Sequence, residues 1–280
     1  MKRNLLWLVV LLAFGFSSCQ KEEDDNNNNN TNLFSTTEDM ALSENLFSDI
    51  FTQVGDAANQ AQDSLGRIQL TTVNSCATLT ISAFDLYTWP KTLTLDFGTT
   101  NCLGNDMRYR RGKIIAQVTN WWKEPGCVVT INFDQYFVND HQILGTKTIT
   151  NLGRNANNNL VYHLSYPDGQ IVKPNNGGTI YWHTERDHEW IEGENTLFHP
   201  WDDVYLVRGT AGGTSANGTN FQVEIVQDLN VLIGCRWIRA GVLNVQIGSY
   251  PTISIDFGDG TCDANATVYF FNQQQPIFMN

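Results

Sequence analysis

Hydrophobic residues in the first part of the chain recur with a helical period. Apolar positions spaced by three and four residues predict one amphipathic helix over residues 35–66. Residues 35–37 are Ser and Thr, which cap helices well, while Glu38 and Asp39 are placed to complete a capping box and Gly66 favours a stop. The apolar stripe consists of Leu42, Leu46, Phe47, Ile50, Phe51, Val54, Ala57, Ala58, Ala61 and Leu65.

From residue 67 onward, apolar and polar positions alternate. Leu93, Leu95 and Phe97 are separated by Thr94 and Asp96, and this period of two is typical of half-buried antiparallel strands. Gly, Asn and Asp turn signals separate the strands, and no second helix long enough for a crossover is expected. We therefore predict an all-β fold: a large antiparallel meander, as a curled sheet, sandwich or partly open barrel, with the N-terminal amphipathic helix packed on it.

Two copies of one motif lie near the ends of the β region. Residues 90–102 match residues 251–262, and each copy runs through Asp-Phe-Gly to a cysteine. We interpret residues 67–280 as a single domain with an internal repeat, in which residues 76–122 and 235–280 are the two copies.

The cysteines of the β region suggest disulfides if the chain is exported. The repeat pairs Cys76 with Cys102 and Cys235 with Cys262, at nearly equal separations. The alternative bridge Cys102–Cys127 is also close in sequence. In the first arrangement Cys127 stays free, and its apolar neighbours predict a buried small side chain and not a nucleophile.

The N-terminus has the features of a secretory signal. Two basic residues precede an apolar run over residues 5–16, which is too short to span a bilayer and ends in Ser17-Ser18-Cys19. This resembles the lipobox of bacterial lipoproteins, in which the signal peptide (here residues 1–18) is removed and Cys19 is lipidated; an ordinary signal peptide with a chance cysteine is the alternative. Residues 19–34, acidic and then Asn-rich, predict a disordered tether.

Charge restricts the partners that can be expected. The chain carries 17 Lys and Arg against 29 Asp and Glu, a formal net charge of −12. Because binding to phosphate backbones needs a basic stripe, this balance argues against nucleic acid. The acyl chains on Cys19 would instead attach the protein to a membrane.

Tryptophan residues are the best candidates for ligand contacts. Trp121 and Trp122 are neighbours, and on a strand neighbouring side chains point to opposite faces, so at least one indole would face away from the helix. Trp182, Trp190 and Trp201 lie in a stretch that is also rich in His, Asp and Glu. An exposed Trp can stack on a sugar ring or a partner protein. The alternative for Trp121 and Trp122 is a loop position folded back on the sheet, because Lys123-Glu124-Pro125 follows at once, and the alternative for the other three is a core anchor in an acidic hairpin.

No residue pattern specifies a catalyst, and only one weak pattern suggests a metal. His-Glu-x-x-His and Gly-x-Ser-x-Gly are absent from the sequence, so neither a zincin nor an α/β-hydrolase is expected. Asp256, Asp259 and Asp263 surround two glycines and offer oxygen ligands for calcium, but their order differs from that of an EF-hand. The alternative is an Asx-type turn pinned by Cys262. We therefore expect no cofactor, with calcium as a weak candidate.

An ordered set of motifs resembles a family of Bacteroidota outer-membrane lipoproteins over most of residues 70–270. The lysine and acidic residues just after Cys19 are also similar to the surface-export signal of these proteins; the alternative is a generic acidic tether on a protein that faces the periplasm. The resemblance implies a lipid-anchored, surface-exposed protein with a β-rich body, and it implies no activity. The motifs in the β region are Arg110-Arg111-Gly112-Lys113-Ile114, Phe137-Val138-Asn139 with Gly145-Thr146, Glu189-Trp190-Ile191-Glu192-Gly193, and the closing Asp256-Phe257-Gly258-Asp259-Gly260-Thr261-Cys262-Asp263.

Three functions are compatible with these features. The leading hypothesis is a non-enzymatic surface lipoprotein that binds a glycan or a protein. The second is a carrier or structural lipoprotein whose curved sheet holds an apolar ligand once the helix moves. The third is a glycan hydrolase that uses a pair of carboxylates between residues 185 and 203.

Overall fold

The computed structural model contains one long helix and many strands. It describes residues 23–64, 71–73, 76–82, 85–196, 200–235, 237–271 and 273–278, so Cys19 and the signal peptide predicted over residues 1–18 lie outside the described residues. The elements are α1 (Glu23–Ser64), η1 (Pro200–Asp202), β1 (Thr71–Val73), β2 (Ala77–Ser82), β3 (Lys91–Asp96), β4 (Cys102–Leu103), β5 (Tyr109–Val118), β6 (Val128–Val138), β7 (His141–Leu144), β8 (Lys147–Arg154), β9 (Leu160–Val172), β10 (Thr179–Glu192), β11 (Val204–Thr214), β12 (Asn220–Leu232), β13 (Ala240–Ile247), β14 (Ile253–Asp259), β15 (Asn265–Phe270) and β16 (Gln273–Phe278).

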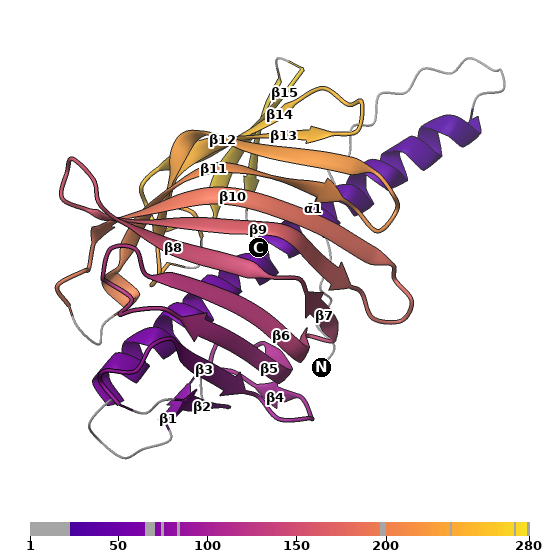
Figure 1. The fold of residues 1–280 in the computed structure, drawn as a ribbon. Coiled ribbons are helices and arrows are strands. Elements are labelled where there is room, and N and C mark those ends of the chain that lie inside the picture. The colour runs from indigo at the N-terminus through magenta and orange to yellow at the C-terminus, as the bar shows by residue number, and fades with distance from the viewer. Residues whose placement is uncertain are drawn as a thin grey trace, which may run out of the picture.

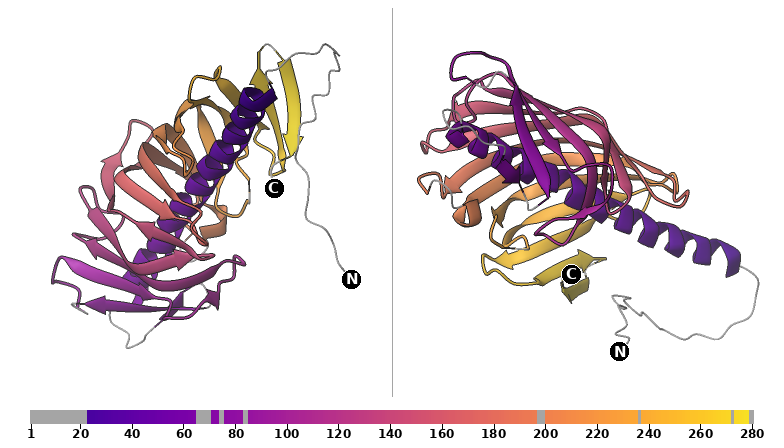
Figure 2. Two further views of the ribbon diagram at one scale, coloured as in Figure 1. Left: turned by 90° about the vertical axis from the view of Figure 1, so that its right-hand side faces the viewer. Right: turned by 90° about the horizontal axis from the view of Figure 1, so that it is seen from below.

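All 16 strands form one antiparallel sheet that curls around α1 (Figure 1). Strands that are neighbours in the sheet are mostly neighbours in sequence, from β1 at one edge to β16 at the other, so the chain is a meander. The helix runs obliquely across the strands on the concave side of the sheet (Figure 2). This confirms the predicted all-β fold with one N-terminal helix packed on a large antiparallel sheet.

The helix is longer than its hydrophobic pattern predicts. It begins at Glu23, so residues 23–34, predicted as part of a disordered tether, are helical; it is described as far as Ser64, and the predicted end at residue 66 lies outside the described residues. Once packing of the apolar stripe has met the cost of nucleation, each further residue adds a backbone hydrogen bond, so even an Asn-rich segment can extend a helix. Asp39 therefore lies in the helix interior and is not part of a cap. Among the described helices, none is long and apolar enough to cross a membrane.

The predicted apolar stripe of α1 forms one side of the core. The buried side chains of the stripe meet the inward-facing residues of the alternating strands in one continuous cluster. Burying such side chains stabilises each by roughly 1.5–3 kcal/mol relative to exposure. The stripe residues that are buried are Leu46, Phe47, Ile50, Phe51, Val54, Ala57, Ala58 and Ala61.

Both predicted disulfides are present. Cys76 is bonded to Cys102 and Cys235 to Cys262, and Cys127 is free and buried, as predicted. The two copies of the repeat also share a turn, because the Asp of each Asp-Phe-Gly accepts a hydrogen bond from the Gly amide at 2.8 Å in the first copy and 2.9 Å in the second.

The register of the strands places the two disulfides at opposite ends of the sheet. Cys102 pairs beside the end of β6, next to the turn at residues 139–140, whereas Cys235 follows β12 at the end where β10 enters β11. We call the first the asparagine end, after its turns at residues 139–140, 175–176 and 217–218. The helix begins at the asparagine end, where Thr36 contacts Ser215, and finishes at the other.

Candidate functional site

The concave face of the sheet is filled by aromatic contacts to α1. The Phe47 ring lies 4.6 Å from that of Tyr166 and 6.0 Å from that of Trp182, measured between ring centres. Phe51 contacts Trp122 at 5.9 Å and lies edge-on to Tyr205 at 5.8 Å. The helix therefore occupies the space in which the curved sheet would hold an apolar ligand.

Three of the five tryptophans selected from the sequence lie in this core. Trp122, Trp182 and Trp190 are 4%, 2% and 4% exposed. Trp121 and Trp122 lie in the connection between β5 and β6 and not on a strand, so the loop alternative holds for this pair. They still diverge: Trp122 stacks on Tyr162 at 4.8 Å beneath the helix, and Trp121 is half-buried on the outside.

Buried ion pairs also join the helix to the sheet. Asp39 accepts from Lys173 at 2.6 Å, and Glu44 pairs with both terminal nitrogens of Arg186. Asp49 accepts from Arg110 at 2.7 Å. The Arg110 side chain is 0% exposed, so its charge depends on carboxylate partners.

Two further basic side chains on the sheet lie beneath the helix. Lys147 is buried and donates from Nζ to the carbonyl oxygen of Phe47 at 2.9 Å. Burial, with the neighbouring Arg186 charge, lowers the pKa of Lys147 to about 7. Burial likewise lowers the pKa of His188 to about 3, helped by the charges of Lys147 and Arg186. Lys147 therefore contacts the backbone of α1 directly, whereas His188 lies beneath the helix as a neutral imidazole near pH 7.

Sequence reasoning did not predict these ion pairs between α1 and the sheet. The pairs lie far apart in the chain, at sequence separations of 134 for Asp39 and Lys173 and 142 for Glu44 and Arg186. The available signal was the presence of acidic residues within and on either side of the apolar stripe of the helix, at positions 39, 44 and 49. This pattern predicts basic partners on the opposing surface, but it cannot say which residues they are.

Most tryptophans of the β domain gather where α1 finishes. Trp89, Trp121, Trp122, Trp190, Trp201 and Trp237 lie in or beside the loops at that end, which we call the tryptophan end; Trp182 lies toward the asparagine end. In Figure 1 these loops are at the left, beyond the ends of β8 and β10. The six are spread over residues 89–237 of the sequence, and only the strand order brings them to one side of the molecule.

Direct contacts connect the loops of the tryptophan end. Lys123 donates from Nζ to the carbonyl oxygen of Glu194 at 2.9 Å and lies 4.6 Å from the ring centre of Trp190. The amide of Gly234 donates to the carbonyl oxygen of Trp201 at 3.0 Å. Gly193 has a φ of 92°, and a Cβ there would lie 2.3 Å from Oδ1 of Asp203, so only glycine allows this close approach.

Several apolar side chains of this end face solvent. Trp201 is 69% exposed, Tyr87 is 87% exposed and Leu86 is 47% exposed. Trp89 and Trp121 are half-buried, with their rings edge-to-face at 4.9 Å. Exposed aromatic groups of this kind mark binding surfaces more often than isolated apolar residues do.

Two carboxyl groups of the tryptophan end are difficult to ionise. Burial raises the pKa of Asp56, on α1, to about 6, with a further contribution from the Asp49 charge. Burial also raises the pKa of Asp203 to about 6, and the charges of Asp202 and Asp56 act in the same direction. Raised carboxyl pKa values are enriched at functional sites.

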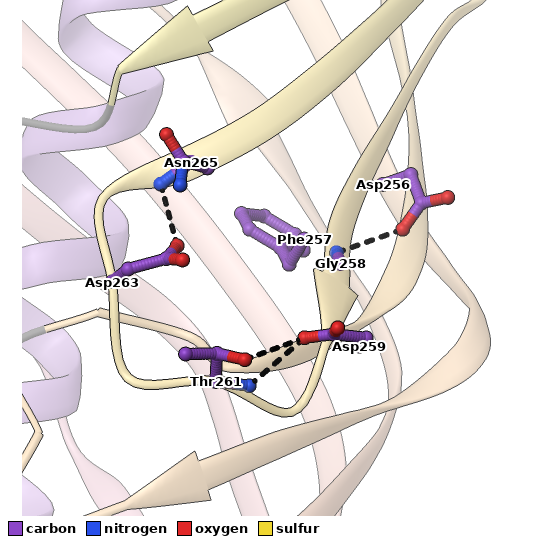
Figure 3. A pocket seen from close by; sticks show the side chains of 7 residues that line it. All are labelled: Asp256, Phe257, Gly258, Asp259, Thr261, Asp263 and Asn265. Atoms are coloured by element: carbon purple, nitrogen blue, oxygen red, sulfur yellow. Dashed lines mark hydrogen bonds between the residues drawn. The ribbon is translucent and has the colours of Figure 1, made fainter.

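The acidic turn that suggested calcium forms a shallow hollow at the start of the β14–β15 connection (Figure 3). The carboxylates of its three aspartates accept hydrogen bonds from different backbone amides: Asp256 from Gly258, Asp259 from Thr261 and Asp263 from Asn265, at 2.9, 3.2 and 2.8 Å. These are Asx-type turns. Within the described residues, no group of three or more His, Cys, Asp or Glu is arranged to hold a metal, and the calcium hypothesis stays a prediction.

Cys127 is placed for packing. Its side chain is 1% exposed, its Sγ lies 3.1 Å from the carbonyl oxygen of Asn120, and burial raises the pKa of its thiol. A buried thiol with a raised pKa is a poor nucleophile.

Comparison of the chain with protein-family models, curated proteins and solved structures finds no match.

Proposed function

We propose that the protein is a lipid-anchored, surface-exposed outer-membrane protein that binds a glycan without catalysis, through its tryptophan end. The observation that carries this proposal is the position of the exposed aromatic loops at the opposite end of the molecule from the start of α1. Cys19 precedes Glu23 by four residues, a stretch that spans at most about 14 Å. A lipid on Cys19 would therefore hold the start of the helix near the membrane.

The length of the helix supports a binding role for the far end. At about 1.5 Å per residue, the 42 residues of α1 extend roughly 60 Å, which would carry the tryptophan end well beyond the lipid headgroups. Indole and phenol rings pack against the apolar C–H face of a sugar ring while their polar atoms stay hydrated. The lipobox, the acidic residues after it and the motif resemblance support the location.

Fluorescence titration tests the binding proposal. The lipidated chain in detergent should show Trp emission that changes with a neutral polysaccharide (dextran, laminarin or yeast mannan). Trp201→Ala should weaken that binding at least tenfold, and Tyr181→Ala, which removes an aromatic side chain that is 53% exposed at the asparagine end, should leave it unchanged. If the unmodified protein binds none of the three, the proposed function is wrong.

Two measurements on the producing bacterium test the location. Protease treatment of intact cells should cleave the protein, whereas survival of the body beside cleaved surface controls would place it in the periplasm. Mass spectrometry should find an acylated Cys19 as the first residue, and an unmodified N-terminus that retains Met1 would contradict the anchor.

A further inference from the structure

The connection between β2 and β3 presents an aromatic side chain on a backbone that is held from inside. Tyr87 is 87% exposed, although it lies in a short loop between two paired strands. Oδ1 of Asp85 accepts hydrogen bonds from the amides of Tyr87 and Thr88 at 2.7 and 2.6 Å. These bonds form an Asx-type turn directly beneath the exposed ring.

A buried ammonium group fixes the same turn. Lys91 is 2% exposed, and its Nζ donates to the carbonyl oxygens of Asp85 and Thr88. The Nζ atom also lies 4.8 Å from the ring centre of Trp89, which is in turn edge-to-face with Trp121. The loop backbone therefore surrounds the Lys91 ammonium group. Because these bonds already order the backbone, it would lose little further conformational freedom when a ligand binds to Tyr87.

The repeat provides a reference for how long this connection needs to be. In the second copy, residues 248–252 join β13 to β14, and Tyr250, which precedes the equivalent proline, is half-buried. In the first copy, residues 83–90 make the same connection, and the extra length includes the exposed Leu86 and Tyr87. The exposed aromatic group is thus an addition to the hairpin and not a requirement of it.

We infer that Tyr87, Trp89 and Trp121 form a preorganised platform for a pyranose ring of an uncharged polysaccharide. The inference rests on the proposed function and identifies the loop and the ligand class. An uncharged sugar is favoured because the surface groups beside the ring include the Asp85 carboxylate, while the ammonium of Lys91 is turned inward. Hydrogen bonds from the amides of Thr88 and Tyr87 lower the pKa of Asp85 to about 2, so it stays ionised and would repel uronic or sulfated sugars.

The size of the platform favours a sugar over a protein. A stable protein interface involves about 20–30 residues on each side. Within residues 85–89, the β2–β3 connection offers the exposed Tyr87 ring, the half-buried Trp89 indole, which contacts Trp121, and the Asp85 carboxylate, which can accept hydrogen bonds from sugar hydroxyl groups. This is enough to contact one or two sugar residues.

Tyr87 variants of the full lipidated chain test the inference, with dextran, laminarin and yeast mannan as uncharged probes and polygalacturonate as the anionic probe. Tyr87→Ala should weaken binding of the recognised neutral polysaccharide at least tenfold, and Tyr87→Phe should retain it, because the ring face and not the hydroxyl makes the contact. Tyr181→Ala is the matched control, since it removes another exposed tyrosine ring at the opposite end. Polygalacturonate should not bind.

The outcomes separate this inference from the proposed function. If Trp201→Ala loses binding while Tyr87→Ala binds as tightly as the unmodified chain, the platform is wrong and the proposed function stands. If the unmodified protein binds no neutral polysaccharide, both are wrong. Preferred binding of polygalacturonate would overturn the ligand class, and loss of binding in Tyr87→Phe would overturn the stacking contact. A thermal melt of each variant checks that the fold is intact, which is expected for so exposed a side chain.

Discussion

The connections between antiparallel strands differ between the asparagine end and the tryptophan end of the sheet. Most turns at the asparagine end, apart from the longer β3–β5 connection over residues 97–108, are short and polar, and Asn139, Asp140, Asn175 and Asn176 adopt the positive φ angles that tight turns require. Three connections at the tryptophan end, over residues 83–90, 119–127 and 193–203, are longer than these turns, and two of them present the exposed rings of Tyr87 and Trp201. The short turns of the asparagine end need only reverse the direction of the chain. The exposed aromatic side chains in the loops of the tryptophan end are not needed for chain reversal.

The helix shows the same difference along its length. Toward the asparagine end, the carboxylates of Asp39, Glu44 and Asp49 are each paired with a cation of the sheet. Toward the tryptophan end, Asp56 has no ion-pair or hydrogen-bond partner among the described residues, and its pKa is raised. Paired charges stabilise the asparagine end. The tryptophan end contains a carboxyl group without a partner among the described residues, together with exposed aromatic side chains, and we associate these features with binding.

Removal of a paired carboxylate should have the largest effect on stability. Asp49→Ala takes from the buried Arg110 one of its two carboxylate partners, and we expect the free energy of unfolding to fall by roughly 4 kcal/mol. Urea denaturation followed by circular dichroism measures this change. Lys113→Gln is the control, because it breaks an exposed pair with Asp96 and should cost less than about 1 kcal/mol. Equal effects in the two variants would contradict a special role for the buried ion pair between Asp49 and Arg110.

Loss of either disulfide should cost slightly less, and by the same amount at both ends. The bridges close loops with separations of 26 and 27 residues, and the chain-entropy model assigns each about 3 kcal/mol. The double variant Cys235→Ser/Cys262→Ser should also weaken polysaccharide binding, since Cys235 follows the residue bonded to Trp201, whereas Cys76→Ser/Cys102→Ser should not. If both double variants bind equally well, the two ends do not differ in function.

Neutralising Asp56 should have a smaller effect of opposite sign. Its folded pKa of about 6 lies above the ordinary value of 3.8, so its contribution to stability is fully present below pH 4 and is lost as the pH rises through 6. Asp56→Asn should therefore raise the free energy of unfolding by about 2 kcal/mol at pH 7.5 and leave it unchanged near pH 4. Denaturation curves at the two pH values measure the difference, and a pH-independent effect would show that the carboxylate is already compensated.

Local patterns were sufficient for the architecture of this protein. The alternation around Leu93 and Leu95 predicted a strand because side chains on a half-buried sheet must alternate, and the stripe through Ile50 and Val54 predicted a helix for the corresponding reason. The repeat predicted both disulfides, since equivalent segments fold alike. The start of the helix was wrong, because extension into the Asn run depends on a helix already docked.

Contacts between residues far apart in the sequence determine the features that the local patterns did not predict. The sequence alone determined one amphipathic helix, a meander of alternating strands and two cysteine bridges, because these depend on periods and spacings within short segments. Only the tertiary structure decided that Trp122, Trp182 and Trp190 are core residues, that Asp39 meets Lys173, and that Tyr87 and Trp201 share one end. Burial and ionic pairing depend on which surfaces meet when the sheet curls around the helix, and a local pattern contains no information about that meeting.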